Sequence, residues 1–492
     1  MKKFNLLLLM SLIFGALVFN SCDDDTEEVI PDAPTVSAPS SNITVAAGES
    51  VDISFTVNVP GGYASANASA QGGSATITNE PAEGATSGTV VVSFTAGATG
   101  GAASVALTVA DQNQKSRNAT AVLSINEEET TVRVTSNISE NTTWETGKVY
   151  ILGGRIAVLN GVTLTIEPGV IVKGEAGAGA NSTVLVVARG GKLMAEGTAE
   201  APIVFTSVAD EISPEDIAAG NFASPNLDPV VKGYWGGLIV LGKAPISVSS
   251  GTEAQIEGIP TSDQNGLYGG NDPADNSGVL KYISIRHGGT EIGEGNEING
   301  LTLGGVGSGT VIENIEVVSN QDDGIEWFGG TVNVKNVVSW NVGDDGIDTD
   351  QSWAGTLDNF VVITPDGHCF ELDGPEGAME AGHTIQNGTI IASASDGSYG
   401  AEDLINVDEN SIVDLKNLYF TNILEGQKIN RVTAPDVTFT GIQLNVSAAE
   451  LPNHVNGAVP AGVTAVSTPT VGADLSVFGW TWASQAGVLT IE

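Results

Sequence analysis

Two acidic segments of nearly the same sequence contain the residues whose types and spacing best suit metal binding or acid–base catalysis. Residues 322–326 read Asp-Asp-Gly-Ile-Glu, residues 344–348 read Asp-Asp-Gly-Ile-Asp, and a looser third copy spans 366–371. If the first two copies stack in register, each carboxylate of one lies over a carboxylate of the other. The carboxylates concerned are Asp322, Asp323, Glu326, Asp344, Asp345 and Asp348.

Stacked carboxylates repel one another, and the folded chain must relieve this repulsion. Two unit charges about 4.8 Å apart repel by roughly 3.5 kcal/mol at an effective dielectric constant of about 20. A bound cation, protonation of some groups, or side chains that splay apart would each relieve it. Hard oxygen ligands in irregular geometry favour Ca²⁺, so these residues predict a calcium site. The alternative is a solvated edge whose Asp and Gly residues only form turns.

The acidic segments need a fold that stacks similar sequences, and the surrounding repeat predicts one. A series of segments shares an Asn followed by an apolar strand, at intervals of about 22 to 30 residues. Coils of this length suit a parallel β-helix. The repeated residues are Asn314, Asn336, Asn359, Asn387 and Asn417, with Tyr282 in the Asn place of an earlier coil. Because adjacent coils lie about 4.8 Å apart, we expect these amides to hydrogen-bond in a structural ladder.

Residues 132–447 resemble the right-handed parallel β-helices of secreted bacterial proteins. Short strands between glycine turns, as at 164–171, are similar to the opening coils of that fold. The last segment, 448–492, is expected to cap the exposed edge of the terminal coil. Its large aromatic residues are Phe478, Trp480 and Trp482. The resemblance implies a pectin-lyase-like fold and assigns no particular activity.

A catalytic role for the acidic segments rests on resemblance within this fold. Paired aspartates on consecutive coils resemble the site of polygalacturonase-type glycoside hydrolases, where carboxylates act as acid and base, and Asp344 and Asp345 would take that part. Polysaccharide lyases of the same fold use calcium with an Arg or Lys base, for which Arg286 and His287 are the candidates. The hydrolase pattern is incomplete, because residues 367–369 read Gly-His-Cys instead of Gly-His-Gly.

Two tryptophans on neighbouring coils are candidates for stacking on a sugar ring. Trp327 and Trp340 would offer large apolar faces if they were exposed. An aromatic stack inside the β-helix is the alternative, and the commoner, arrangement. Cys369 is expected in the core rather than in a metal site.

Residues 34–126 alternate apolar and polar residues in short runs separated by turns, as at 51–57 and 103–109. This spacing predicts an Ig-like β-sandwich, a module that commonly serves as a stalk. No Cys-Trp-Cys signature is available, because the whole chain has only 2 cysteines. The predicted fold class is therefore all-β, a right-handed parallel β-helix preceded by a small Ig-like β-sandwich.

Residues 1–21 resemble a lipoprotein signal peptide. Lys2 and Lys3 precede an apolar run that is too short for a comfortable transmembrane helix. The run ends in Phe-Asn-Ser before Cys22, which resembles the lipobox of bacterial lipoproteins. This resemblance implies that Cys22 is acylated and anchors the chain in outer-membrane lipid. Residues 22–33 form an acidic tether, and its Asp-rich start resembles the export signal of Bacteroidetes-type lipoproteins that face the cell exterior.

Charge excludes one class of partner. The chain has 59 acidic against 18 basic residues and a formal net charge of −41, so nucleic acid is not expected as a partner. The Gly-rich stretch 304–309 opens no helix, so no nucleotide or organic cofactor is expected. Calcium remains the one candidate cofactor.

These features together predict a lipid-anchored binding or adhesion protein at the cell surface, without catalytic activity and with an extracellular glycan as its ligand. The alternative is a carbohydrate-active enzyme, either a calcium-dependent polysaccharide lyase or a polygalacturonase-like glycoside hydrolase. The incomplete acid and base set favours the binding protein. So does the scarcity of basic residues, because a strongly acidic chain repels acidic polysaccharides.

Overall fold

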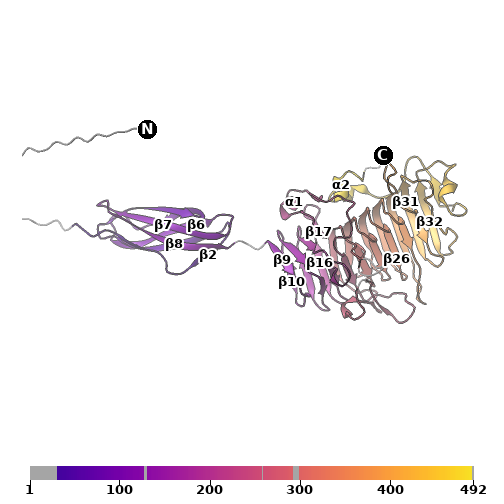
Figure 1. Cartoon of the computed structure of the whole chain (residues 1–492), viewed down its shortest axis with the longest axis horizontal. Coiled ribbons are helices and arrows are strands. Elements are labelled where there is room, and N and C mark those ends of the chain that lie inside the picture. The colour runs from indigo at the N-terminus through magenta and orange to yellow at the C-terminus, as the bar shows by residue number, and fades with distance from the viewer. Residues whose placement is uncertain (1–29, 127–129, 258, 292–297, 490–492) are drawn as a thin grey trace, which may run out of the picture. The chain divides into compact units, whose positions relative to one another are not determined.

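The computed structural model describes residues 30–126, 130–257, 259–291 and 298–489. The chain divides into two compact units, Met1–Glu128 and Glu129–Glu492 (Figure 1). The predicted signal peptide, Cys22 and most of the acidic tether lie outside the described residues. The short helices in the described ranges include none with the length and hydropathy of a membrane span.

The first unit is a β-sandwich of two four-stranded sheets. One sheet has the order β1 (Thr35–Ser37), β3 (Ser50–Asn58), β6 (Ser87–Ala96), β5 (Gly73–Asn79), and the other has the order β2 (Ile43–Ala46), β8 (Ser116–Asn126), β7 (Gly101–Asp111), β4 (Tyr63–Gln71). Neighbouring strands are antiparallel except for the parallel pair β2 and β8. Buried and exposed residues alternate along β3, so that Ile53, Phe55 and Val57 face the core.

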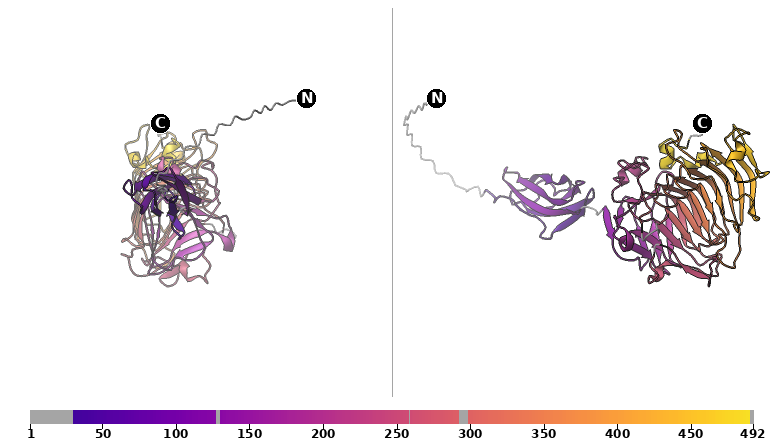
Figure 2. Two further views of the ribbon diagram at one scale, coloured as in Figure 1. Left: turned by 90° about the vertical axis from the view of Figure 1, so that its left-hand side faces the viewer. Right: turned by 45° about the vertical axis from the view of Figure 1, so that its right-hand side comes forward.

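The second unit is a parallel β-helix built on two long sheets (Figure 1). The larger sheet has 15 strands: β9 (Thr131–Val134), β10 (Thr142–Trp144), β11 (Val149–Leu152), β13 (Thr163–Ile166), β14 (Ile171–Gly174), β16 (Lys192–Glu196), β17 (Ile203–Ser207), β21 (Gly278–Arg286), β23 (Val311–Val318), β25 (Val334–Trp340), β27 (Thr356–Ile363), β29 (His383–Ile391), β31 (Val413–Thr421), β32 (Val437–Leu444) and β33 (Val463–Ala465). Figure 2 shows strands of successive coils lying side by side. The predicted all-β fold class with a right-handed parallel β-helix is confirmed.

The smaller sheet has 8 strands: β12 (Arg155–Val158), β15 (Val184–Val187), β18 (Leu238–Leu241), β22 (Leu301–Gly304), β24 (Ile325–Phe328), β26 (Ile347–Asp350), β28 (Phe370–Leu372) and β30 (Asn406–Val407). A separate antiparallel hairpin joins β19 (Glu253–Gln255) to β20 (Leu267–Gly269). The α-helices are α1 (Pro214–Ala218) and α2 (Trp482–Gln485). Both are short, so nearly all of the described backbone hydrogen bonds of this unit join strands and turns.

Five long strands of the larger sheet, β23, β25, β27, β29 and β31, contain the repeated Asn at a position with positive φ. Asn314, Asn336 and Asn359 have φ of 60°, 58° and 59°, a left-handed conformation that Asn tolerates better than most residues with a side chain. Asn336 Nδ2 donates to Asn314 Oδ1 at 2.9 Å, and Asn359 Nδ2 donates to Asn336 Oδ1 at 2.8 Å. The next amide breaks the ladder, because Asn387 Nδ2 donates to Asp358 Oδ1 at 2.7 Å. The Asn repeat therefore marks a change of backbone direction within these five strands.

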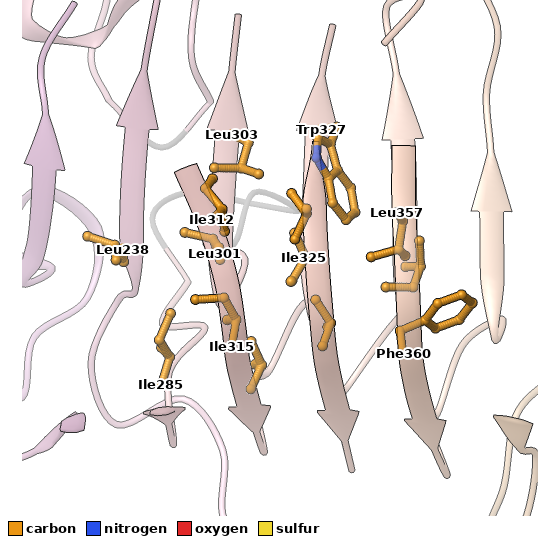
Figure 3. Close-up of a cluster of buried hydrophobic side chains, with 14 of the residues drawn as sticks. Leu238, Ile285, Leu301, Leu303, Ile312, Ile315, Ile325, Trp327, Leu357 and Phe360 are labelled. Atoms are coloured by element: carbon orange, nitrogen blue, oxygen red, sulfur yellow. The ribbon is translucent and has the colours of Figure 1, made fainter. Parts of the chain in front are cut away.

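Apolar side chains of both sheets fill the interior of the β-helix (Figure 3). Trp327 is one of them: it is fully buried and stacks on Trp353 with ring centroids 4.6 Å apart. The prediction that Trp327 stacks on a sugar is therefore wrong. The reason is strand alternation, since Ile325 and Trp327 of β24 point inward and Glu326 between them points outward. Cys369 is buried in the same core, as expected.

The C-terminal segment departs from the predicted cap. Strand β33 pairs in parallel with β32, so the β-helix continues past residue 447. Leu451 and Val459 pack against the core and lie in the part that does cover the last coil. Residues 466–489, here called the C-terminal strap, then run back along the larger sheet towards earlier coils. Ala473 N donates to Thr389 Oγ1 at 2.9 Å, and Ala483 N donates to Glu316 Oε1 at 2.9 Å.

The aromatic residues of the strap cover the side of the β-helix, not its end. Phe478 and Trp482 pack with Val318 and Val338, which belong to β23 and β25. Trp480 packs further back, in the cluster that contains Ile171 of β14. The predicted role of these aromatics as a terminal cap is therefore wrong, because the outer face of the larger sheet is itself apolar and needs cover.

Candidate functional site

The acidic segments lie on the outer face of the smaller sheet and in the turn before each strand. Glu326 of β24 pairs with Asp348 of β26, which in turn pairs with Glu371 of β28. Their side chains point outward because alternate residues of each strand fill the core. The acidic face is defined here as Asp322, Asp323, Glu326, Asp344, Asp345, Asp348, Asp350 and Glu371.

A second column of side chains runs along the turns beside this row. The backbone N–H of Asp345 donates to Asp323 Oδ1 at 2.8 Å, and the backbone N–H of His368 donates to Asp345 Oδ1. The His368 imidazole also lies against Asp345, with Nδ1 3.0 Å from Oδ1. This hydrogen bond raises the pKa of His368 to about 9, although burial opposes it. The Asp345–His368 contact therefore favours the protonated form of the imidazole.

Burial and mutual repulsion raise the pKa of several other carboxylates on this face. The pKa values of Asp323, Glu326 and Asp348 lie well above their usual range, first because of desolvation and then because of neighbouring carboxylates. Desolvation raises the pKa of Asp350 and of Glu371 to about 7. These groups resist ionisation together, and a bound proton or cation would relieve their repulsion.

Three overlapping groups of side chains on this face have the spacing of metal ligands. Within each group, one ligand atom per residue lies within 4.8 Å of the others. The groups are Asp322 with Asp323 and Asp344, Asp323 with Asp345 and Asp348, and Asp345 with His368 and Glu371. Among the described residues, no lysine or arginine forms an ion pair with Asp323, Glu326 or Asp348.

Two buried acceptor oxygens at this face have no hydrogen-bond partner among the described residues. They are Asp348 Oδ1 and Asn299 Oδ1, and the amide nitrogen of Asn299 donates to Glu326. An oxygen acceptor buried without a donor costs free energy, and a hard cation would satisfy it. The donor set is mainly carboxylate and amide oxygen, which fits Ca²⁺ better than a metal that prefers nitrogen or sulfur.

Sequence analysis missed three members of this neighbourhood. Asp350 follows Asp348 by two positions on the same strand, so strand alternation alone would have placed both on one face. Asn299 occupies the position of Asp323 one coil earlier, where its different residue type hid the repeat. Glu257 comes from the segment after β19 and lies 3.5 Å from the Asn299 amide nitrogen. No local signal marks Glu257, because it reaches the face by tertiary packing.

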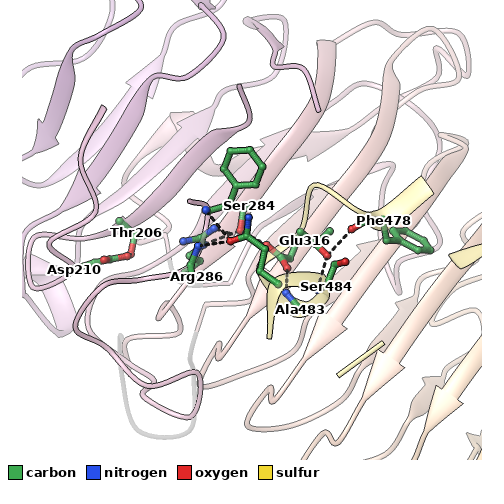
Figure 4. Close-up of polar contacts among 12 residues, drawn as sticks. Thr206, Asp210, Ser284, Arg286, Glu316, Phe478, Ala483 and Ser484 are labelled. Atoms are coloured by element: carbon green, nitrogen blue, oxygen red, sulfur yellow. Dashed lines mark hydrogen bonds and ion pairs between the residues drawn. The ribbon is translucent and has the colours of Figure 1, made fainter. Parts of the chain in front are cut away.

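Arg286 and His287 lie elsewhere, so the predicted lyase base is wrong. Arg286 is the last residue of β21 in the larger sheet and His287 follows it, and both are buried, at 1% and 0% exposure. Arg286 Nε donates to Ser284 Oγ at 2.8 Å, and Ser284 Oγ donates to Glu316 Oε2 at 2.5 Å (Figure 4). The guanidinium lies under Trp482, with Cζ 5.0 Å from the ring. The Arg286 side chain is therefore buried beneath the C-terminal strap, where it contacts Glu316 and Trp482.

Trp340 does not provide an open sugar platform either. It is 4% exposed and meets Trp482 edge-on, with ring centroids 5.8 Å apart. The strap brings Trp482 onto Trp340, and no feature of the local sequence around residue 340 indicates this contact. The acidic segments and the two tryptophans therefore do not form one site.

Comparison with known proteins gives one family match. The family described as a pectate-lyase like beta helix domain matches residues 136–220 and 222–479. Among solved structures, a family 28 exopolygalacturonase from Yersinia enterocolitica is similar at 11% identity and a TM-score of 0.20, covering 90% of this chain and 100% of that chain. A TM-score of this size supports no inference about function. A search of curated proteins finds no match.

Proposed function

This chain belongs to the pectate-lyase-like beta helix family, and from that premise we propose that it is a calcium-dependent glycan-binding protein of the cell surface. The proposed calcium centre is the acidic face of the smaller sheet. The proposed ligand is an extracellular polysaccharide that contributes oxygen atoms to the bound ion.

The observation that carries the proposal is the stacking of carboxylates across three coils. Glu326, Asp348 and Glu371 are register partners, and the metal-ligand groups beside them share Asp323 and Asp345. When both members of such a pair are ionised about 4.8 Å apart, they repel by roughly 3.5 kcal/mol at an effective dielectric constant of about 20. A calcium ion accepts about six to eight oxygen ligands. Bound between these carboxylates, it would attract each of them and so offset their mutual repulsion.

The charge of the chain indicates how a glycan would be held. With a formal net charge of −41, the protein repels acidic polysaccharides unless a cation lies between them. Several members of the acidic face, among them Asp344, Asp348 and Glu371, are at least partly exposed. Calcium bound there would keep coordination positions for hydroxyl or carboxylate oxygens of a sugar.

Lipid anchoring at Cys22 is part of the proposal and is tested separately. We expect acylated Cys22 to hold the chain in the outer membrane, with the β-helix facing the cell exterior. The variant Cys22→Ser should lose labelling by radioactive palmitate and leave the membrane fraction. A variant that still fractionates with the outer membrane would remove the anchor from the proposal and leave the glycan-binding part standing.

A glycoside hydrolase is the second candidate, and the pKa values on the acidic face favour it over a lyase. Asp350 and Glu371 have pKa values of about 7, the range in which a carboxylic acid protonates a leaving group at neutral pH. Hydrolysis of a glycosidic bond needs such an acid beside an ionised carboxylate. The lyase loses its base because Arg286 is buried in the larger sheet.

The test is a glycan array probed with the purified protein in calcium and again in EGTA, with analysis of products from every bound glycan. Binding that requires calcium, and that is lost in the double variant Glu326→Gln with Asp348→Asn, supports the proposal. Glu313→Gln is the matched control, since it removes a carboxylate from a strand of the larger sheet. Release of shorter sugars with saturated ends would instead identify a hydrolase, and binding unchanged by EGTA would contradict a calcium centre.

A further inference from the structure

A cavity of about 520 Å³ lies at the C-terminal ends of several strands of the larger sheet. Trp340, Ile363, Ile391 and Thr421 are the last residues of β25, β27, β29 and β31, and all four line the cavity. The other walls are residues 228–230, the loop 393–399 and residues 487–488 of the C-terminal strap. Its volume is within the range of roughly 300–1,000 Å³ that is usual for small-molecule sites. No described residue of the acidic face lines it.

The cavity combines apolar surface with neutral hydrogen-bonding groups. Ile363, Ile391 and Tyr399 supply apolar surface, while Asn341, Thr364 and Asn422 supply amide and hydroxyl groups. Of the described residues that line it, Asp228 alone carries a charge. One carboxylate is too few for a hard divalent cation, and in a chain of net charge −41 it disfavours an anionic ligand. The lining therefore suits an uncharged ligand that has both hydroxyl groups and an apolar face.

Hydrogen bonds hold the asparagine side chains of the cavity in place, and in these bonds the amide nitrogen of the asparagine is the donor. Asn341 Nδ2 donates to Pro229 O at 2.8 Å, and Asn422 Nδ2 donates to Ser393 O at 3.1 Å. Asn445 Nδ2 donates to Thr421 Oγ1 at 3.3 Å. These bonds fix the walls and leave the exposed side chains of Asn422 and Asn445 with carbonyl oxygens that accept hydrogen bonds from a ligand hydroxyl.

Exposed apolar side chains gather around the same cavity. Tyr399 is 43% exposed and Val230 is 50% exposed, and both line it. Leu424, 39% exposed, lies against Gly397 of the lining loop. A group of exposed apolar side chains beside a cavity is typical of a ligand or partner site, and an aromatic ring beside neutral acceptors is suited to the apolar face of a sugar ring.

We propose that this cavity is a second glycan site, which binds an uncharged sugar with its ring stacked on Tyr399. The hydroxyl groups of the sugar would donate to the carbonyl oxygens of Asn422 and Asn445. The site goes beyond the proposed calcium centre, because it uses a different face of the β-helix and no metal-ligand group lines it. Its occupancy should therefore not depend on calcium.

The test uses the full chain on an array of uncharged glycans in EGTA, followed by calorimetric titration with the best-bound glycan. Tyr399→Ala should weaken binding at least about tenfold, while Tyr399→Phe should retain it, because the ring is kept. Tyr234→Ala is the matched control, since Tyr234 is 40% exposed but does not line the cavity. Both positions are exposed, and equal melting temperatures would verify that the three variants fold.

Two results would overturn this inference. One is that no uncharged glycan binds at millimolar concentration in EGTA, and the other is that Tyr399→Ala binds as tightly as the wild type. Neither result affects the calcium centre, whose signature is binding that EGTA abolishes. Conversely, calcium-independent binding that is sensitive to Tyr399 would stand even if the acidic face held no ion.

Discussion

Glu326 and Asp348 are register partners on adjacent parallel strands, and both carboxylates point out of the β-helix on the same face. Neither forms an ion pair with a lysine or arginine among the described residues. The pKa of each lies well above its usual range, first because of desolvation. The proposed calcium centre can therefore be tested at this pair through its effects on fold stability.

Calcium should raise the melting temperature of the wild type, and EGTA should lower it. An ion that binds only the folded state stabilises it by about 2.7 kcal/mol at a hundredfold excess over its dissociation constant. Magnesium should substitute poorly, since it demands tighter octahedral geometry. The double variant Glu326→Gln with Asp348→Asn should lose the calcium response and melt higher than the wild type in EGTA, because the repulsion is gone. Scanning calorimetry measures both effects, and an unchanged calcium shift in the variant would contradict the site.

Without calcium, the free energy of unfolding should fall as pH rises from about 4 to about 7. The folded-state pKa values of Asp350 and Glu371 are about 7, above the value of about 4 in an unfolded chain. The folded state therefore binds more protons in this window, and that stabilisation is lost as pH rises through the folded pKa. Urea titrations in EGTA between these pH values measure the slope, and Asp350→Asn should reduce it. A flat profile would show that these carboxylates ionise freely.

Replacing Asn336 tests the amide ladder. Asn336→Ala should cost about 1–3 kcal/mol, because Asn314 Oδ1 loses its donor and Asn359 Nδ2 loses its acceptor. Alanine is also strained at a φ of 58°, which adds about 1 kcal/mol. Asn336→Gly removes the amide without that strain, so the difference between the two variants in urea denaturation separates the contributions. Wild-type stability of both variants would show that the ladder contributes nothing.

We expect Arg286 to stabilise the fold and to take no part in glycan binding. Arg286→Met should destabilise the fold by about 3–5 kcal/mol, because it leaves Glu316 buried without its opposite charge. Glu316 also accepts the hydrogen bond of Ala483 N, so the C-terminal strap should become sensitive to protease in this variant. Adding Glu316→Gln should recover part of the stability by removing the buried charge. If Arg286→Met instead kept its stability and lost glycan binding, a functional role would return to Arg286.

The placement of the acidic face follows from sequence alone because it depends on periodicity. Coils of similar length put the same positions of successive repeats in register, so Glu326 had to meet Asp348 once the β-helix was inferred. The same logic should have excluded Trp327 as a sugar platform. Glu326 and Trp327 are neighbours on one strand and must face opposite sides of the sheet, so an outward Glu326 requires an inward Trp327.

Only the tertiary structure decided the contacts that are made by segments outside the repeat. The C-terminal strap returns along the larger sheet and buries Arg286 and Trp340 under Trp482. Glu257 reaches the acidic face from an insertion between coils. The walls of the cavity at Tyr399 likewise come from separate loops. Such segments carry no sequence repeat that sets their register, and their positions depend on which apolar surface they cover. Local sequence patterns therefore determined the coils of the β-helix. Long-range packing determined which segments lie on those coils.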